Sequence, residues 1–253
     1  MDFKEQVKRI VKDIPSGQTL TYKEVARKAG QPKAQRLVAS ILSKNHNHNI
    51  PCHRVIKSDG SLGGFNQGVL KKAHLLYTEG YNFPSSKVLD ESFFKQDSQK
   101  IAKSLIGKFL VKGDKALIIS EVEVYSGKKD LASHASKGKT KRTAPMFGKP
   151  GIWYVYLVYG VYYMLNIVTE KKGFPAAILI RATFSVKGPG KLTKHLKIDK
   201  SFNNKPAKRQ TGLWIEDRGI KPDPSNIKAL KRVGIDYAKE WKDKLLRFKY
   251  LKN

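Results

Sequence analysis

The chain contains a single cysteine, Cys52, which lies between a proline and a histidine in the segment NIPCHRV at residues 49–55. A lone cysteine has no partner for an intramolecular disulfide, and its neighbours His53 and Arg54 supply an imidazole and a guanidinium. Such groups can lower the pKa of a thiol and create a nucleophile. Many free cysteines are instead small buried hydrophobic residues, so the surrounding sequence has to decide between the two roles.

A second group of reactive residues lies further along the chain, where two glutamates precede several tyrosines. Glu121 and Glu123 are two residues apart, and on an extended strand they would share one face. A carboxylate at such a position can act as general base toward a water molecule. Spacing alone does not separate the two glutamates, and tyrosines that alternate along a strand are equally typical of ordinary packing.

The elements that must position Cys52 are predicted to be short helices. Apolar residues at helical spacing predict one helix from Phe3 to just before residues 15–17. Thr21 and Glu24 have the spacing of a capping box and predict the start of a second helix. After a turn at residues 30–32, a third predicted helix carries several basic side chains. Two short helices about a glycine turn, the second one basic, are typical of a helix-turn-helix.

The remainder of the chain mixes helix and strand. Residues 101–110 predict a helix, whereas residues 117–125, 153–168 and 176–182 are rich in β-branched and aromatic residues and predict strands. The basic C-terminal stretch is expected to be more helical. We therefore expect a mixed α+β domain with an antiparallel sheet. The proline-bearing stretch at 82–87 predicts a boundary, with one domain at residues 1–83 and another at residues 88–253.

The composition points to a polyanionic partner. The chain has 50 Lys and Arg against 21 Asp and Glu, a formal charge of +29, and both halves are basic (+8 for residues 1–84 and +21 for the rest, by direct count). Such a charge attracts nucleic acid. The longest apolar run, at residues 152–168, is interrupted by glycine and rich in tyrosine, unlike a membrane-spanning helix. We expect a cytoplasmic protein, associated with the nucleoid through DNA and not with a membrane.

The segment around Cys52 resembles the active domain of the O6-alkylguanine-DNA alkyltransferases. The residues that carry the resemblance are PCHRVI (51–56), the glycine-containing GSLGGF (60–65), LLYTEG (75–80), and, in the predicted helix-turn-helix, TYKEVA (21–26) and PKAQR (32–36). The resemblance covers about residues 1–82 and implies a mainly α, winged-helix-like domain.

The resemblance also implies the chemistry of this domain. Cys52 would accept the methyl group of O6-methylguanine from a base flipped out of the duplex, because O6 is inaccessible within the stack. His53 would take the thiol proton through a water, and Glu79 would orient the imidazole. Residues implied to contact the substrate or the DNA are Tyr22, which assists extrusion and protonation of the base, Arg36, which fills the gap in the duplex, Asn45, which links the helix-turn-helix to the thiol, Arg54, and Phe65.

The sequence departs from the alkyltransferase pattern near the thiol. The loop between Asn45 and Cys52 is one residue shorter than is usual in the family, and Phe65 replaces a frequent tyrosine that caps the guanine pocket. These departures concern the shape of the pocket and not the nucleophile. In a related class tryptophan replaces the cysteine and the protein only binds damage, and Cys52 argues against that class.

The rest of the chain resembles the alkyladenine (3-methyladenine) DNA glycosylases. The residues that carry this resemblance are EVEVY (121–125), SHA (133–135), MFG (146–148), GIWYVYLVYG (151–160), Asn166, LIRA (179–182), GPGKL (188–192) and RVGIDY (232–237). The order and spacing of these motifs match over nearly the whole segment.

The glycosylase resemblance implies that Glu123 is the general base and that Arg181 helps to hold the water or the carboxylate. Three aromatic residues would sandwich the extruded base, a fourth would intercalate, and an asparagine would exclude normal guanine by crowding its 2-amino group; these are Tyr125, His134 and Tyr156, then Tyr159, then Asn166. The matched site has no lysine that could form a Schiff base. A monofunctional enzyme that leaves an abasic site is therefore expected.

Taken together, the sequence predicts a DNA-repair protein that acts on double-stranded DNA containing alkylated bases. We expect it to transfer methyl groups to Cys52 and to excise 3-methyladenine and related purines. One alternative is an N-terminal half that binds damage without transfer, and a second is a basic nucleic-acid-binding protein without catalysis. No metal, no cofactor and a monomer are expected, since the histidines and the cysteine lack metal-ligand spacing.

Overall fold

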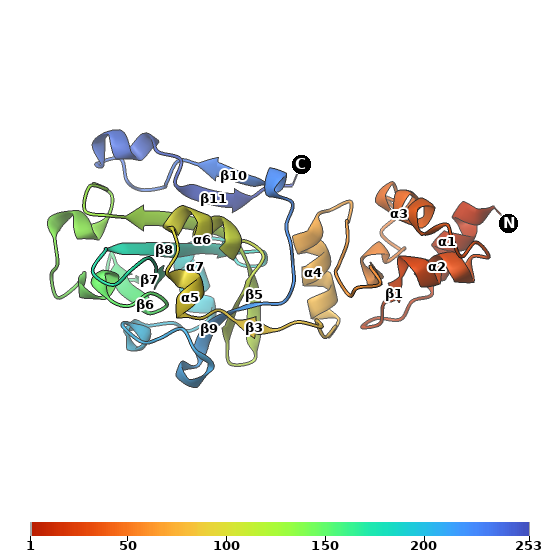
Figure 1. The fold of residues 1–253 in the computed structure, drawn as a ribbon, viewed down its shortest axis with the longest axis horizontal. Coiled ribbons are helices and arrows are strands. Elements are labelled where there is room, and N and C mark those ends of the chain that lie inside the picture. The colour runs from red at the N-terminus through yellow and green to blue at the C-terminus, as the bar shows by residue number, and fades with distance from the viewer. Residues whose placement is uncertain (1, 253) are drawn as a thin grey trace. The chain divides into compact units, whose positions relative to one another are not determined.

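The computed structural model describes residues 2–252, which form two compact units. The first unit comprises residues 2–86 with 218–221 and 252, and the second comprises residues 87–217 and 222–251. Each unit has its own secondary structure and its own buried residues (Figure 1).

The first unit is built mainly from helices. They are α1 (Phe3–Lys12), α2 (Tyr22–Lys28), α3 (Gln35–Ser43) and α4 (Val69–Thr78). Two short strands, β1 (Leu20–Thr21) and β2 (Val55–Ile56), pair in parallel. The apolar sides of α1, α2 and α3 meet in one cluster of buried residues, which also contains Cys52 and Val55. The thiol is therefore part of the core on which these helices pack.

The capping box that the sequence predicts at the start of α2 is present. The backbone N–H of Glu24 donates to Thr21 Oγ1 at 3.1 Å, and the N–H of Thr21 donates to Glu24 Oε2 at 2.7 Å. Two N–H groups that α2 itself leaves unpaired are thereby satisfied. This cap fixes where α2 begins, and so where Tyr22 lies.

The second unit is an antiparallel sheet, as the sequence predicts. Its main path runs in the order β3 (Lys87–Val88), β9 (Leu213–Asp217), β4 (Phe109–Lys112), β5 (Lys115–Ser126), β8 (Ala176–Thr183), β7 (Tyr162–Val168) and β6 (Trp153–Val158). The second half of β5 pairs with β8 and also with β11 (Arg247–Tyr250), which pairs in turn with β10 (Ile227–Leu230). Residues 121–123 therefore lie between two strands.

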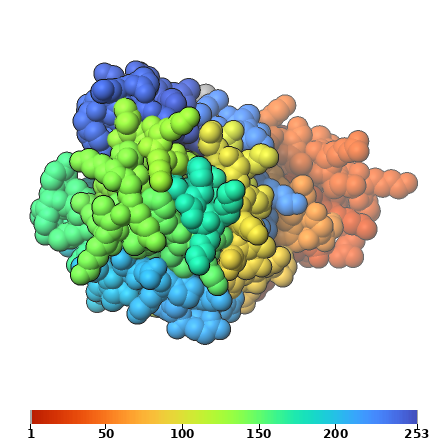
Figure 2. Space-filling model, turned by 60° about the vertical axis from the view of Figure 1, so that its left-hand side comes forward, coloured from red at the N-terminus to blue at the C-terminus, as the bar shows by residue number. Residues whose placement is uncertain are grey.

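Three helices accompany the sheet within residues 87–251. They are α5 (Glu91–Phe94), α6 (Ser98–Leu105) and α7 (Pro189–His195). The dark blue C-terminal segment lies on the surface of this unit beside the green part of the chain (Figure 2).

Two predictions about secondary structure in the middle of the chain are wrong in part. The helix predicted at residues 101–110 ends at Leu105, because Gly107 adopts φ 90° and the chain then enters β4. The strand predicted at residues 153–168 is a hairpin, since the chain reverses at Tyr159 and Gly160, whose φ values are 52° and 68°.

The C-terminal stretch is not mainly helical. It forms the hairpin of β10 and β11 with only a short 3-10 turn, Lys239–Asp243, between the two strands. Its lysines and leucines favour a helix locally, but pairing of β11 with β5 prevails. No helix in residues 2–252 has the length and apolar character that a membrane crossing requires.

The cap at Thr21 yields a test of stability. Replacing Thr21 by Ala removes the side-chain acceptor and should cost about 1 kcal/mol of unfolding free energy, whereas Thr21→Ser keeps the hydroxyl and should cost much less. Denaturant unfolding followed by far-UV circular dichroism measures the helices. All three tryptophans, at positions 153, 214 and 241, lie in the second unit, so tryptophan fluorescence serves as an internal reference. Equal losses in both variants would contradict the role of the cap.

Candidate functional site

Cys52 begins a short 3-10 turn, Cys52–Arg54, that follows Pro51 and leads directly into β2. Its side chain is only 5% exposed. Asn45 Nδ2 donates to Cys52 Sγ at 3.2 Å and to the carbonyl of Asn47 at 3.0 Å. Asn45 thereby connects the end of α3 to the thiol and gives the sulfur a polar contact inside an apolar core.

The environment of the thiol differs from the one expected from its neighbours in sequence. Burial raises the pKa of the Cys52 thiol, and the Asn45 amide, the backbone of Cys52 and the charge of Lys72 oppose that rise. His53 and Arg54 take no part in this, because their side chains bind Glu79. The thiol pKa is thus raised, and the polar groups that oppose the rise come from Asn45, the backbone and Lys72, while the two neighbouring side chains in the 3-10 turn are directed to Glu79.

His53, Arg54 and Glu79 form one hydrogen-bonded group. His53 Nε2 lies 2.8 Å from Glu79 Oε1, and Arg54 contributes Nε at 3.0 Å to Oε2 and Nη2 at 2.8 Å to Oε1. Burial acts to raise the pKa of Glu79, but hydrogen bonds from Arg54, His53 and the Gly17 N–H outweigh it and hold the pKa at about 2. Burial also lowers the pKa of His53. At neutral pH a neutral imidazole therefore faces an ionised carboxylate.

Lys72, which the sequence interpretation missed, is fully buried close to the thiol. Its Nζ donates to the carbonyl of Val55 at 2.6 Å and lies 3.4 Å from that of Gly64, and burial lowers its pKa to about 7. The available signal was its place in α4, three residues after Val69 and four before Leu76, on the apolar face of the helix. A lysine at such a position is buried only where polar groups pair with its ammonium.

Two of the predicted pocket residues also lie near the thiol, and one does not. Tyr22, at the first turn of α2, donates from its hydroxyl to the carbonyl of Gly64 at 3.4 Å, and both burial and Cys52 raise its pKa. Phe65 packs against the core that contains Cys52, with its ring edge-on to His53 at 6.3 Å between centroids. Arg36 lies on the exposed side of α3, among solvent-facing residues.

Glu123 lies in the middle of β5 and is completely buried. Its carboxylate accepts hydrogen bonds from three different segments: Arg181 Nη1 at 3.2 Å and the Tyr125 hydroxyl at 3.0 Å on Oε2, and the Val233 N–H at 2.9 Å on Oε1. Burial raises the pKa of Glu123, and these donors, with Arg181 the strongest, act in the opposite direction. The pKa of this carboxylate is therefore closer to neutrality than that of an ordinary glutamate.

Glu121, which spacing alone could not separate from Glu123, has different partners. It binds Arg181 Nε at 3.2 Å, but its other contacts are with Arg247 Nη1 at 3.1 Å and Lys249 Nζ at 3.7 Å. Three cations surround Glu121, whereas Glu123 shares Arg181 with it and also accepts hydrogen bonds from a tyrosine and a backbone N–H whose residues line a cavity. Arg181 bridges the two carboxylates, so both lie on one face of β5, as their spacing predicts.

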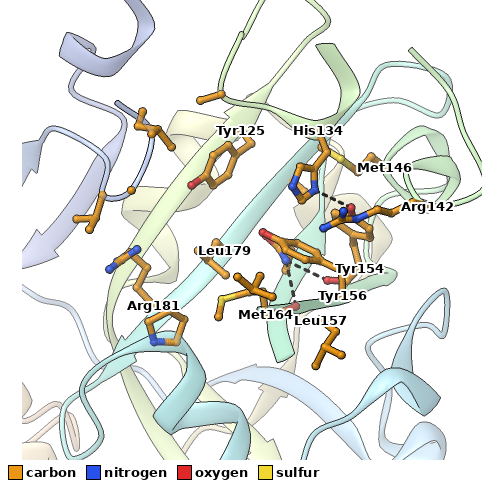
Figure 3. Close-up of a pocket in the computed structure, with 18 of the residues that line it drawn as sticks. Tyr125, His134, Arg142, Met146, Tyr154, Tyr156, Leu157, Met164, Leu179 and Arg181 are labelled. Carbon is orange, nitrogen blue, oxygen red and sulfur yellow. Dashed lines mark hydrogen bonds between the residues drawn. The ribbon is translucent and has the colours of Figure 1, made fainter. Parts of the chain in front are cut away.

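A cavity of about 470 Å³ is lined by the three residues that bind Glu123, namely Tyr125, Arg181 and Val233. Five residues of the predicted base-binding site line it together with Arg181, namely Tyr125, His134, Tyr156, Tyr159 and Asn166. Figure 3 shows Tyr125 on one side of the cavity and His134 and Tyr156 on the other. The cavity therefore has aromatic walls, and its two aromatic sides come from β5, β6 and the 3-10 turn His134–Lys137.

The His134 side of the cavity is a small network of rings. His134 Nδ1 lies 2.9 Å from the Tyr154 hydroxyl, and its ring meets that of Tyr156 edge-on at 4.6 Å between centroids. Burial, with smaller contributions from Arg142 and Lys137, lowers the pKa of His134 to about 4. His134 is consequently a neutral ring at physiological pH.

Tyr154 and Arg142 were not singled out from the sequence. Burial raises the pKa of Tyr154 to about 12, and the guanidinium of Arg142 lies 5.2 Å from the centre of the Tyr156 ring. Tyr154 could have been found from its position two residues before Tyr156, on the same face of β6. Arg142 lies in an irregular basic loop, where the sequence carries no such periodicity.

Tyr159 and Asn166 lie on the β6–β7 hairpin. Tyr159 occupies its tip and is 93% exposed, while its neighbour in the turn is Gly160. Asn166 is buried in β7, and its amide donates to the carbonyls of Tyr154 at 3.1 Å and Met164 at 3.2 Å. The hairpin therefore contributes both residues to the lining of the cavity, Asn166 as a buried side chain and Tyr159 at the solvent-exposed mouth.

Within residues 2–252, no three His, Cys, Asp or Glu side chains lie together in a way that could hold a metal ion. The absence of a metal or cofactor stays a prediction.

Two family models match the chain. The model described as "Methylpurine-DNA glycosylase (MPG)" matches residues 92–187 and 183–253, which is more than half of the chain. The model described as "6-O-methylguanine DNA methyltransferase, DNA binding domain" matches residues 2–81.

Similar proteins are known for both parts. Proteins named as 3-methyladenine DNA glycosylases are 45% identical in Legionella pneumophila (strain Lens) and in Sodalis glossinidius, and each alignment covers 65% of this chain and 94% or 98% of the relative. Among solved structures, Mycobacterium tuberculosis OGT in complex with DNA is 37% identical over 32% of this chain, with a TM-score of 0.31, and this chain spans about half (49%) of it. S. pombe ATL in complex with DNA is 32% identical over 32% of this chain and 77% of that one, with a TM-score of 0.30.

The glycosylase relatives are matched over nearly their whole length. DNA repair, DNA glycosylase and methyltransferase are thus the functional classes to which the two matched parts point. By the match of its larger part, the chain belongs to the methylpurine-DNA glycosylase family.

Proposed function

We propose that the second part of the chain, residues 88–253, excises 3-methyladenine and related damaged purines from double-stranded DNA. The observation that carries this proposal is the buried carboxylate of Glu123, which is bound by Arg181 and Tyr125, two residues that line an aromatic cavity. A flipped purine would stack between Tyr125 on one side and His134 with Tyr156 on the other. Stacking of this kind is worth about 1–3 kcal/mol per base.

The proposed reaction is hydrolysis of the N-glycosidic bond. Glu123 accepts a proton from a water molecule as the water oxygen bonds to C1′ of the deoxyribose. The bond from C1′ to the base nitrogen breaks, and its electron pair leaves with the base. Arg181 holds the carboxylate in place, Asn166 disfavours guanine by crowding its 2-amino group, and Tyr159 fills the gap in the duplex. No lysine takes part, so the product is an abasic site.

The choice of Glu123 over Glu121 is testable with a matched pair of variants. Glu123→Gln removes the general base but keeps a polar side chain, so excision from N-methylated DNA should fall by a factor of about 10² to 10⁴. Glu121→Gln keeps Glu123 and should lose much less. Single-turnover release of base, read as alkali-cleavable sites, measures both rates.

Equal activity of wild type and Glu123→Gln would mean that the wrong carboxylate has been assigned. The same assay on wild type is also the test of the whole proposal, because a non-catalytic DNA-binding protein would leave no abasic sites.

We propose further that the first part, residues 1–83, is an alkyltransferase domain that accepts the methyl group of O6-methylguanine on Cys52. The support is the arrangement of Asn45 on the thiol and of His53 on Glu79. The thiol proton would pass through a water to His53. The thiolate then bonds to the methyl carbon as the bond from that carbon to O6 breaks, and the guanine takes a proton from Tyr22.

DNA is the proposed partner of both parts. In the first part, α2 and α3 would act as a winged-helix-like helix-turn-helix, with Arg36 on the exposed side of α3 entering the duplex and Phe65 closing the guanine pocket. Structural neighbours that are complexes with DNA and the charge of +29 support this proposal. A monomer and a location in the cytoplasm, with the nucleoid, are part of the same proposal.

Transfer to Cys52 can be read directly by mass. After incubation with O6-methylguanine DNA, intact protein should gain the mass of one methylene unit at Cys52, and Cys52→Ala should gain nothing while keeping its glycosylase activity. If the wild type binds the lesion but its mass stays unchanged, the first part recognises damage without transfer, which is the alternative stated above.

Lys72 provides a test of how the buried thiol is activated. Removing its charge in Lys72→Met should raise the pKa of Cys52, because that charge opposes the effect of burial, and should slow transfer several-fold at neutral pH. Lys71→Met removes a lysine next to it in α4 and is the matched control.

Since Cys52 is the sole cysteine, its rate of alkylation by iodoacetamide across pH reports only this thiol. The pH midpoint should move upward in Lys72→Met and stay in place in Lys71→Met. An unmoved midpoint in both would show that Lys72 serves packing only.

A further inference from the structure

An ion pair that the proposed mechanism does not use lies behind the cavity. Arg232 and Asp130 are both completely buried in their side chains and bind each other twice, through Nη1 to Oδ2 at 2.6 Å and Nη2 to Oδ1 at 2.8 Å. Arg232 Nη1 also donates to the carbonyl of Val124 at 2.8 Å. Two parallel hydrogen bonds between a guanidinium and a carboxylate fix both groups in one plane.

This pair connects the Tyr125 side of the cavity to the segment that binds Glu123. Val124, whose carbonyl Arg232 holds, lies between Glu123 and Tyr125 in β5. The next residue after Arg232 is Val233, whose N–H donates to Glu123 Oε1 at 2.9 Å. The guanidinium of Arg232 also lies over the ring of Tyr125, 4.9 Å from its centre.

Asp130 extends the connection to the His134 side. Its Oδ1 accepts the N–H of Ala132 at 3.1 Å, and its backbone carbonyl accepts the N–H of Ser133 at 2.9 Å. Ser133 in turn is the cap of the 3-10 turn that begins at His134. The same ion pair therefore sets the position of the general base, of Tyr125 and of the turn that carries His134.

The segment from Lys231 to Ile235 has no regular structure of its own that could hold the Val233 N–H in place. It follows the end of β10 at Leu230, and Gly234 within it has φ 74°. A carboxylate that depends on a backbone donor from an irregular loop needs that loop to be fixed from elsewhere. The side chain of Arg232 makes this connection, to β5 and to the loop that contains Asp130.

We propose that Arg232, locked by Asp130, is a positioning residue for the glycosylase reaction, which holds the Val233 N–H on Glu123 and the ring of Tyr125 against the cavity. This inference rests on the proposed function of the site. Its effect should be on the chemical step, because neither side chain of the pair lines the cavity itself or is exposed to solvent. Misplacement of a reacting group by a small distance is costly in rate even when binding is retained.

The direction of the pH effect follows from the groups around Glu123. Arg181 from β8, Arg247 from β11, Tyr125 from β5, Tyr156 from β6 and the Val233 N–H all face this carboxylate. Losing one donor that stabilises the ionised form raises the pKa of Glu123 further. The base form is then reached only at higher pH, so the acid side of the rate profile should move upward.

The test compares Arg232→Lys with a control that weakens a different ion pair. Lysine keeps the charge opposite Asp130 but cannot bind two carboxylate oxygens and the Val124 carbonyl at once. The control is Lys108→Met, which removes the 2.6 Å contact of Lys108 with Asp217 in the same unit, away from the cavity. Circular dichroism and thermal unfolding report whether each variant is folded and how much stability it has lost.

We expect kcat of Arg232→Lys to fall roughly tenfold, with KM for lesion DNA changed little and the acid limb of the pH profile moved upward. Lys108→Met should lose stability without either change. If Arg232→Lys is too unstable, the neutral pair Arg232→Gln with Asp130→Asn removes both buried charges together and should give the same direction of change. An Arg232→Lys enzyme with the wild-type pH profile and kcat would overturn the proposal.

A measurement that needs no activity separates this inference from the proposed function. The pKa of Glu123 can be followed by NMR of protein labelled with ¹³C at the glutamate carboxyl carbon, and the Glu123 signal is the one that disappears in Glu123→Gln. It should be higher in Arg232→Lys than in wild type and unchanged in Lys108→Met. An unchanged value in Arg232→Lys sinks the positioning role even if no base excision is detected, whereas absence of excision in wild type contradicts the proposed function alone.

Discussion

The second unit depends on keeping one carboxylate, Glu123, buried without bulk water. Burying a charged group is costly unless hydrogen bonds replace its hydration. Its donors come from β5, from β8 and from the loop after β10, which are far apart in the sequence. The sheet register, the C-terminal hairpin and the loop near Asp130 must therefore all form before this carboxylate is stable. The cavity is built from the same segments, so the site is assembled when the unit folds.

The first unit also buries a group that reacts in its charged form, the thiol of Cys52. A thiol is easily buried but is reactive only as a thiolate, which burial disfavours. Asn45 and Lys72 supply the compensating polarity, and Lys72 has itself lost part of its affinity for a proton through burial. Each group thus makes the charged form of the other easier to reach. Arg54 holds Glu79, which in turn binds His53, so in the proposed transfer the side chain that accepts the proton is separate from those that polarise the sulfur.

What the sequence predicted well was local or periodic. The capping box at Thr21 needs only four residues, and β5 and β8 have the composition of strands along their whole length. The C-terminal hairpin was missed because its partner strand, at residues 121–123, lies more than a hundred positions earlier. Glu121 and Glu123 could not be separated by a period of two, and only their different partners in space distinguish them. The place of Lys72 on the apolar face of α4 could have indicated its burial, but its partners lie in other elements, as do those of Arg142, and the spacing along the chain does not identify them.

The hairpin turn at Tyr159 has a consequence for the proposed entry of this residue into a duplex. A residue other than glycine with φ 52° occupies a sparsely populated backbone region, at a cost of about 1–3 kcal/mol. This cost falls on the folding of the chain and not on the encounter with DNA. The folded turn fixes the backbone of Tyr159 before any duplex arrives, so in the proposed function little backbone freedom would be lost when the ring inserts. The conformational change needed for insertion would then fall mainly on the DNA, and the ease with which its base pairs unstack would decide where the ring enters.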